Sequence, residues 1–187
     1  MGISAIAPAG SAQGGEDPEH DELRQFLQET ISSSSSFEDR FDAEVWLVDM
    51  SSRLERFVPD PAERLALLQV VHSNAVQAAL PPELVLAVIE VESTFDRFAV
   101  SRVGAQGLMQ VMPFWKDEIG RAGDNLTDIA TNLSYGCRIL QFYLQREKGH
   151  LPRALARYNG SLGRSVYSDK VERAWRKNWK NQPLKWR

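Results

Sequence analysis

A single carboxylate, Glu92, stands at the end of a segment that is otherwise almost wholly apolar. The segment opens with Pro81-Pro82-Glu83, and every residue from 84 to 91 except Glu90 is apolar. A helix that is apolar on all sides belongs in a protein core. The pattern therefore predicts a buried helix over 83–93, which the rest of the chain must enclose.

The surroundings of Glu92 indicate what such a carboxylate does. An ionised carboxylate in a core is costly unless it is paired, so the group usually keeps its proton. Val88 and Ile89, one turn before Glu92, are apolar and are expected to raise its pKa. A carboxylic acid that is neutral near pH 7 is suited to general acid catalysis, which favours glycosidic-bond chemistry.

Glycosidases normally use two carboxylates, and this sequence offers no convincing second one. Glu90 is two residues from Glu92 and projects from the opposite side of a helix. Asp96 lies four residues after Glu92 but past the expected helix end, where it more plausibly caps a turn.

The remaining pattern predicts a mainly α chain. An amphipathic helix is expected from residue 41 to before Pro59, with apolar residues Phe41, Val45, Val48, Leu54 and Phe57. A second begins at Pro61 with Asp60 as N-cap and runs to about residue 80, carrying Leu65, Leu68, Val71, Val76 and Ala79. Further helices are expected near 129–148, 152–158 and 166–179, and a short extended stretch near 105–109. Residues 1–38 are rich in Gly, Ser and acids and predict a flexible leader with a short helical patch near 21–30, before one domain over 39–187.

Composition excludes several other functions. Cys137 is the only cysteine, so no intrachain disulfide forms, and its apolar pattern predicts a small buried residue. His20, His72 and His150 show no ligand spacing, so neither a catalytic metal nor another cofactor is predicted. We also expect no nucleic-acid surface and no membrane span, and find no convincing signal peptide in 1–15.

Several ordered motifs give the chain a family resemblance. Glu92-Ser93 is followed by Ser101, by Gly-Leu-Met-Gln-Val-Met-Pro over 107–113, and much later by Tyr158-Asn159. Over about residues 60–175 the chain thereby resembles the lytic transglycosylases of the soluble-lytic-transglycosylase (SLT) and goose-lysozyme-like family. The resemblance implies a mainly α, lysozyme-like catalytic domain without cofactor, acting on peptidoglycan strands in the cell envelope or periplasm.

The resemblance also implies the chemistry and the site residues. The family cleaves the β-1,4 bond between N-acetylmuramic acid and N-acetylglucosamine and forms a 1,6-anhydro ring, with one Glu as acid and then base. Glu92 matches that residue, and the predicted supporting or substrate-binding residues are Ser101, Gln110, Met112, Tyr158, Asn159 and Tyr167. Ser101 would hydrogen-bond Glu92 or the substrate acetamide, or be an ordinary turn residue. Gln110 would contact sugar or tie down its loop, Tyr158 would approach the acid, and Tyr167 would line the glycan groove.

Some alternatives stay open at this point. A muramidase on the same fold would use water in place of the sugar hydroxyl, and a non-catalytic scaffold would only bind peptidoglycan. Trp175 and Trp179 would form a helix-docking stripe or a sugar-stacking platform. Eight bases over 164–187 indicate either a solvated helix or a surface for an anionic polymer such as glycan with peptide carboxylates. The acidic leader is a candidate for recruiting a cell-envelope partner.

Overall fold

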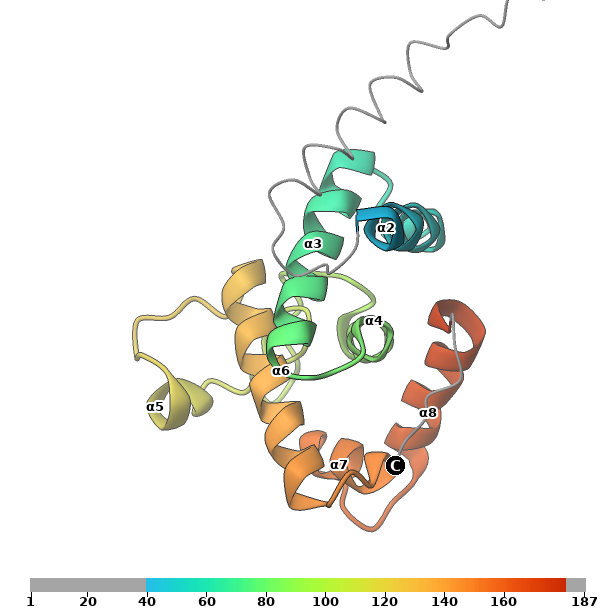
Figure 1. Ribbon diagram of the computed structural model, residues 1–187. Coiled ribbons are helices and arrows are strands. Elements are labelled where there is room, and N and C mark those ends of the chain that lie inside the picture. The colour runs from blue at the N-terminus through green and yellow to red at the C-terminus, as the bar shows by residue number, and fades with distance from the viewer. Residues whose placement is uncertain (1–39, 181–187) are drawn as a thin grey trace, which may run out of the picture.

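The structure, a computed structural model, describes residues 40–180. The predicted leader and its short helical patch lie outside the described residues. The described part contains α2 (Arg40–Leu54), α3 (Pro61–Gln77), α4 (Pro82–Ser93), α5 (Trp115–Ile119), α6 (Ile129–Arg146), α7 (Leu151–Tyr158), α8 (Val166–Ala174) and the π-helical turn η1 (Trp175–Trp179) (Figure 1). Within 40–180 extended pairing is limited to two isolated bridges, which join Gln106 to Val100 and to Val111. The mainly α prediction is confirmed.

Helix α4 forms the centre of the core, as its apolar sequence predicts. Its six consecutive residues from 84 to 89 are each at most 1% exposed. In Figure 1 α4 is seen nearly end-on, with α3 and α8 on either side, and both helices pack against it. The helix ends at Ser93 because Thr94 and Phe95 adopt left-handed backbone conformations, with φ values of 53° and 67°.

The predicted cap at Asp60 is confirmed as the start of α3, but the predicted buried faces of two helices were partly wrong. The Asp60 side chain accepts a hydrogen bond of 2.7 Å from the Glu63 amide, which confirms the N-cap of α3. On α2 the contacting stripe is Ala43, Leu47, Met50 and Leu54, and the predicted Val45 and Val48 are each 52% exposed. The predicted Val76 on α3 is also exposed, and so is Ala79, which lies beyond the end of that helix. The predicted and the observed stripe on α2 have the same helical spacing. Which of them is buried depends only on the side of α2 on which the neighbouring helices lie.

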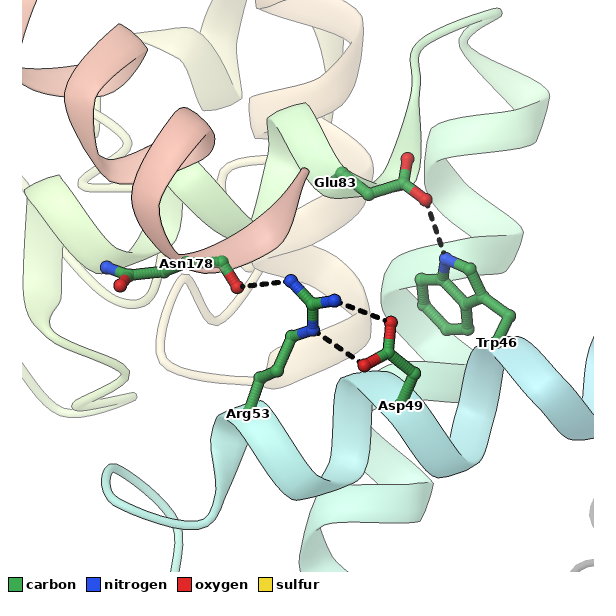
Figure 2. A network of polar contacts seen from close by, with 5 residues as sticks. All are labelled: Trp46, Asp49, Arg53, Glu83 and Asn178. Atoms are coloured by element: carbon green, nitrogen blue, oxygen red, sulfur yellow. Dashed lines mark hydrogen bonds and ion pairs between the residues drawn. The ribbon is translucent and has the colours of Figure 1, made fainter. Parts of the chain in front are cut away.

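Hydrogen bonds connect α2 to the start of α4 and to η1 (Figure 2). Arg53 donates to both carboxylate oxygens of Asp49, at 2.7 and 2.9 Å, and to the backbone carbonyl of Asn178 in η1 at 3.1 Å. The indole of Trp46 donates to Glu83, at the start of α4, at 2.8 Å. Helix α2 therefore holds the first turn of α4 and the last turn of the described chain in place.

The last helical segment docks through its tryptophans. Trp175 and Trp179 are 8% and 0% exposed. The Trp179 ring packs against the rings of Phe57 and Phe95. The helix-docking interpretation is therefore confirmed and the sugar-stacking alternative is wrong. Cys137 is also buried, and burial raises the pKa of its thiol to about 12, so it is an inert core residue as predicted.

Within the described residues, no one helix combines the length and apolar character needed to cross a bilayer. Helices α3 and α4 meet that criterion only when taken together, and the chain bends by 117° between them.

Candidate active site

Glu92 lies in the last turn of α4, where its side chain leaves the core. Val88 and Ile89, one turn earlier, are both fully buried. Burial raises the pKa of the Glu92 carboxyl from 4.5 to about 7, and a hydrogen bond from Tyr167 partly opposes this effect. The carboxyl is thus close to half-protonated at neutral pH, for the physical reason that the sequence pattern indicated.

Tyr167 is the direct partner of Glu92. Its hydroxyl donates to Glu92 Oε1 at 2.6 Å, and its ring is only 6% exposed. Burial and the nearby Glu92 charge raise the pKa of this phenol well above 10, so it keeps its proton and remains a donor. Tyr167 was predicted to line the glycan groove, and the structure shows that its hydroxyl contacts the acid itself.

Tyr158, which was predicted to approach the acid, binds the neighbouring loop. Its hydroxyl donates to the backbone carbonyl of Met109 at 2.7 Å. Burial and the Glu92 charge raise its pKa well above 10, which indicates that it shares the environment of the acid. Tyr167 holds the contact that was expected of Tyr158. Asn159 follows as the exposed C-cap residue of α7.

Ser93 and Gln110 hold the loop over 99–111 against the end of α4. Ser93 directly follows Glu92, and its hydroxyl donates to the carbonyl of Leu108 at 2.8 Å. The Gln110 amide donates to the carbonyls of Ala99 and Gly107, at 3.1 and 3.0 Å. Of the two roles predicted for Gln110, the structure therefore has the one that ties down the loop.

Ser101 lies within the same loop, and Met112 directly follows it. The Ser101 hydroxyl oxygen accepts a hydrogen bond of 3.0 Å from the Ala105 amide, in place of the expected contact with Glu92. Ser101 therefore acts as the ordinary turn residue that was one of its predicted roles. Its hydroxyl hydrogen remains available to donate. Met112 is half-buried, whereas Met109 is fully buried in the core.

Asn132 is a structural residue that the sequence reasoning missed. It lies on α6 and is 1% exposed. Its side-chain oxygen, Oδ1, accepts a hydrogen bond of 2.8 Å from the Met109 amide. Its amide group donates to the carbonyls of Gln106 and Leu126, at 2.8 and 2.7 Å. The available signal was an amide side chain on the apolar stripe of α6, because a buried amide requires partners.

The two other carboxylates near Glu92 in sequence are engaged elsewhere. Glu90 accepts hydrogen bonds from Asn178 and Trp179, with distances of 2.7 to 2.9 Å. Asp96 caps its own turn by accepting the Phe98 amide at 2.9 Å, as predicted. Within residues 40–180, no three His, Cys, Asp or Glu side chains are grouped so that they could hold a metal ion.

The chain matches a family of known proteins over the region that contains these residues. The model of the transglycosylase SLT domain matches residues 69–181, which include Glu92, Tyr158 and Tyr167. The chain belongs to this family. The predicted family is therefore confirmed, together with the lysozyme-like fold class that the resemblance implied.

Individual relatives match the chain over part of their own length. The chain is 31% identical over 104 residues to the transglycosylase of Enterobacteria phage PRD1, covering 56% of this chain and 38% of that protein. It is 31% identical over 136 residues to membrane-bound lytic murein transglycosylase C of Yersinia pestis (strain Pestoides F), covering 62% of this chain and 38% of that protein. The 70-kDa soluble lytic transglycosylase in complex with bulgecin A aligns with a TM-score of 0.47 and 22% identity, covering 90% of this chain and 32% of that one. The chain spans less than two-fifths of the length of these proteins.

Proposed function

We propose that this SLT-family chain is a peptidoglycan lytic transglycosylase. It would cleave the β-1,4 bond between N-acetylmuramic acid and N-acetylglucosamine and leave a 1,6-anhydro end. The observation that carries this proposal is the half-buried Glu92 carboxyl, whose pKa is about 7. A group with that pKa can donate a proton in one step and accept a proton in the next at the same pH.

The contact with Tyr167 supports different tasks for the two oxygens of Glu92. Oε1 accepts the hydrogen bond from Tyr167, so the proton of the neutral acid belongs on Oε2. Oε2 would give this proton to the bridging glycosidic oxygen while the bond to the anomeric carbon breaks. The bond electrons leave with that oxygen, and the ring develops oxocarbenium character.

The second step needs a base and a nucleophile. The Glu92 carboxylate would take the proton from the C6 hydroxyl of the muramic acid, and that oxygen would then bond to the anomeric carbon. No water is consumed, and Glu92 regains its proton. Because the substrate supplies the nucleophile, one carboxylate suffices, which fits the engagement of Glu90 and Asp96 in other contacts.

Substrate contacts are proposed for the residues around the loop over 99–111. Ser101 retains a hydroxyl hydrogen that would donate to the substrate acetamide. Met112 would form the apolar floor under a sugar ring, and the exposed Asn159 would hydrogen-bond the strand. Gln110 and Tyr158 would act indirectly by fixing the loop.

A substrate in the cell wall would require the chain to act in the cell envelope, and the periplasm is the compartment that we propose. A relative named as a membrane-bound lytic murein transglycosylase supports this location. Recruitment of an envelope protein by residues 1–38 is a proposal that concerns residues outside the described part of the chain.

Mass spectrometry of the soluble products from purified sacculi tests the proposed reaction. Products that end in anhydromuramic acid are lighter by one water than products with reducing ends, and they are the expected result. Reducing ends would make the protein a muramidase. Binding to sacculi without release would leave only the peptidoglycan-binding scaffold.

A further inference from the structure

A basic hollow of about 560 Å³ lies between the end of α2, α4 and the α8–η1 segment. Four basic residues line it, with a single carboxylate: Arg56, Lys170, Arg173, Lys177 and Glu90. Lys170, Arg173 and Lys177 follow one another at intervals of three and four residues, which puts them in one row along the helical surface. The hollow therefore presents an aligned row of positive charges.

The single carboxylate does not neutralise this row. Glu90 accepts from Asn178 at both oxygens and from the Trp179 indole, and Arg56 lies 3.7 Å from it. Among residues 40–180, no carboxylate lies within ion-pair distance of Lys170, Arg173 or Lys177. The three charges thus remain available to an anionic ligand.

The neighbouring acids of α8 have other partners. Asp169 accepts a hydrogen bond of 2.8 Å from the Ser165 hydroxyl. Glu172 is paired with Arg176 at 2.5 Å. The two acids that alternate with the basic row along α8 are therefore each engaged by a residue outside that row.

The hollow and the candidate active site share two elements, although Glu90 and Glu92 project from opposite sides of α4. Val91, which lines the hollow, immediately precedes Glu92 on α4. Lys170 follows Tyr167 by three residues on α8, which is about 4.5 Å along a helix axis. An acidic branch long enough to pass from Glu92 around the end of α4 would consequently meet Lys170.

We propose that this basic hollow binds the free carboxylates of the peptide stems that branch from the glycan strand. The inference rests on the proposed function, because it assumes that a muramic acid unit lies at Glu92. The stem is attached to that same sugar, so its carboxylates branch from the strand at the unit being cleaved. Lysine and arginine without internal partners are the side chains that such carboxylates would pair with. The protein would then prefer peptide-bearing strands over stripped ones.

The test combines one triple variant with two forms of the substrate. The variant Lys170→Gln/Arg173→Gln/Lys177→Gln removes the three charges from exposed positions. The control Arg138→Gln/Arg146→Gln/Lys148→Gln removes three exposed charges from α6 and the turn after it. Co-sedimentation with intact sacculi, and competition of that binding by soluble strands stripped of stems by an amidase, give the two affinities. The Glu92→Gln background prevents cleavage during this measurement.

We expect the hollow variant to bind intact sacculi five- to tenfold more weakly at low salt, at about twofold for each exposed ion pair. Its affinity for stripped strands stays at the parent value, and the difference disappears near 1 M salt, where charges more than about 3 Å apart are screened. The control variant binds both substrates as the parent does. Thermal unfolding of all three proteins verifies that each is folded.

Three results would overturn the assignment. They are unchanged binding of intact sacculi, an equal loss on both substrates, and an equal loss in the control variant. Cleavage of intact sacculi by the protein with Glu92 intact is measured separately. Failure of that cleavage would refute the proposed function, whereas cleavage without any effect of the stems would refute only the role of the hollow.

Discussion

Tyr167 donates a hydrogen bond of 2.6 Å to Oε1 of Glu92, although 75 residues separate the two in sequence. The contact works against burial in setting the pKa of the acid. Burial raises the pKa and is the larger effect, whereas the phenol lowers it by stabilising the carboxylate. The resulting value of about 7 allows Glu92 to hold a proton and to release it under the same conditions.

Removal of this donor by Tyr167→Phe should shift the pH dependence of cleavage. Burial then acts alone, the pKa of Glu92 rises, and the basic limb of the kcat/KM profile moves to higher pH. At neutral pH kcat should fall about tenfold, since a lost hydrogen bond to a charged group costs about 1.4 kcal/mol or more. A pH–rate profile on soluble glycan strands measures both effects.

Tyr158→Phe is the matched control for that profile. Its hydroxyl binds the Met109 carbonyl, so its loss should lower stability and leave the basic limb where it is. A basic limb that stays fixed in Tyr167→Phe, or that moves equally in both variants, would contradict the assignment of the limb to Glu92.

Glu92→Gln should abolish cleavage while preserving binding to sacculi. The amide keeps the size and polarity of the side chain but cannot give or take a proton, and general acid–base catalysis is worth up to about 10⁴-fold. Release of soluble muropeptides should fall at least about 10³-fold. Glu90→Gln, two residues away, keeps an oxygen for Asn178 and Trp179 and should retain activity within a few-fold. Wild-type lysis by Glu92→Gln would show that another group is the acid.

The raised pKa of Glu92 also predicts how stability depends on pH. The unfolded chain ionises near 4.5 and the folded chain near 7, so between these values the folded state binds more protons and stability falls as pH rises. At 1.36 kcal/mol per pKa unit, the whole span amounts to about 3 kcal/mol as an upper bound. Glu92→Gln should therefore be more stable than the parent at pH 8 and nearly equal at pH 4.5. Urea unfolding at the two pH values tests this, and the same difference at both would contradict it.

The fold was predictable where local signals determine it. Asp60 and Asp128 cap α3 and α6 through hydrogen bonds to the third amide beyond each, and short polar caps before apolar helices are readable in a sequence. The buried side of α2 was not predictable in the same way. The exposed Val45 and the buried Ala43 belong to equally regular stripes, and the choice depends on where α3 and η1 lie.

The candidate site shows the same division between local and long-range information. The environment of Glu92 was predictable because Val88 and Ile89 belong to its own helix. The partners of the two tyrosines were not, because these contacts span 75 and 49 residues and depend on how α7 and α8 pack. Asn132 was missed for a related reason, since its three partners lie on the loop over 99–111 and before α6.

Two glycines of the same loop offer a matched test of its packing. Gly107 has a φ of 75°, and a Cβ there would overlap the Leu126 carbonyl and the Asn132 amide. Gly104 has a φ of 88°, but a Cβ there meets no atom within 4 Å. Gly104→Ala should cost about 1–2 kcal/mol from backbone strain alone, and Gly107→Ala about 3 kcal/mol or more because overpacking adds to the strain. Equal unfolding free energies for the two variants would mean that the loop does not pack against α6 in solution.

Asn132→Ala should be among the most destabilising substitutions outside the apolar core. It leaves the Met109 amide and the carbonyls of Gln106 and Leu126 without their partner in a buried setting, and each unsatisfied group costs about 1–3 kcal/mol. We expect a loss of about 3 kcal/mol or more by urea unfolding. Cleavage should fall as well, because the loop beside Glu92 loses its attachment to α6. Asn125→Ala is the control, since this exposed asparagine only caps its own turn and should cost at most about 1 kcal/mol. If the two variants lost the same stability, the loop would have to be held by contacts other than those of Asn132.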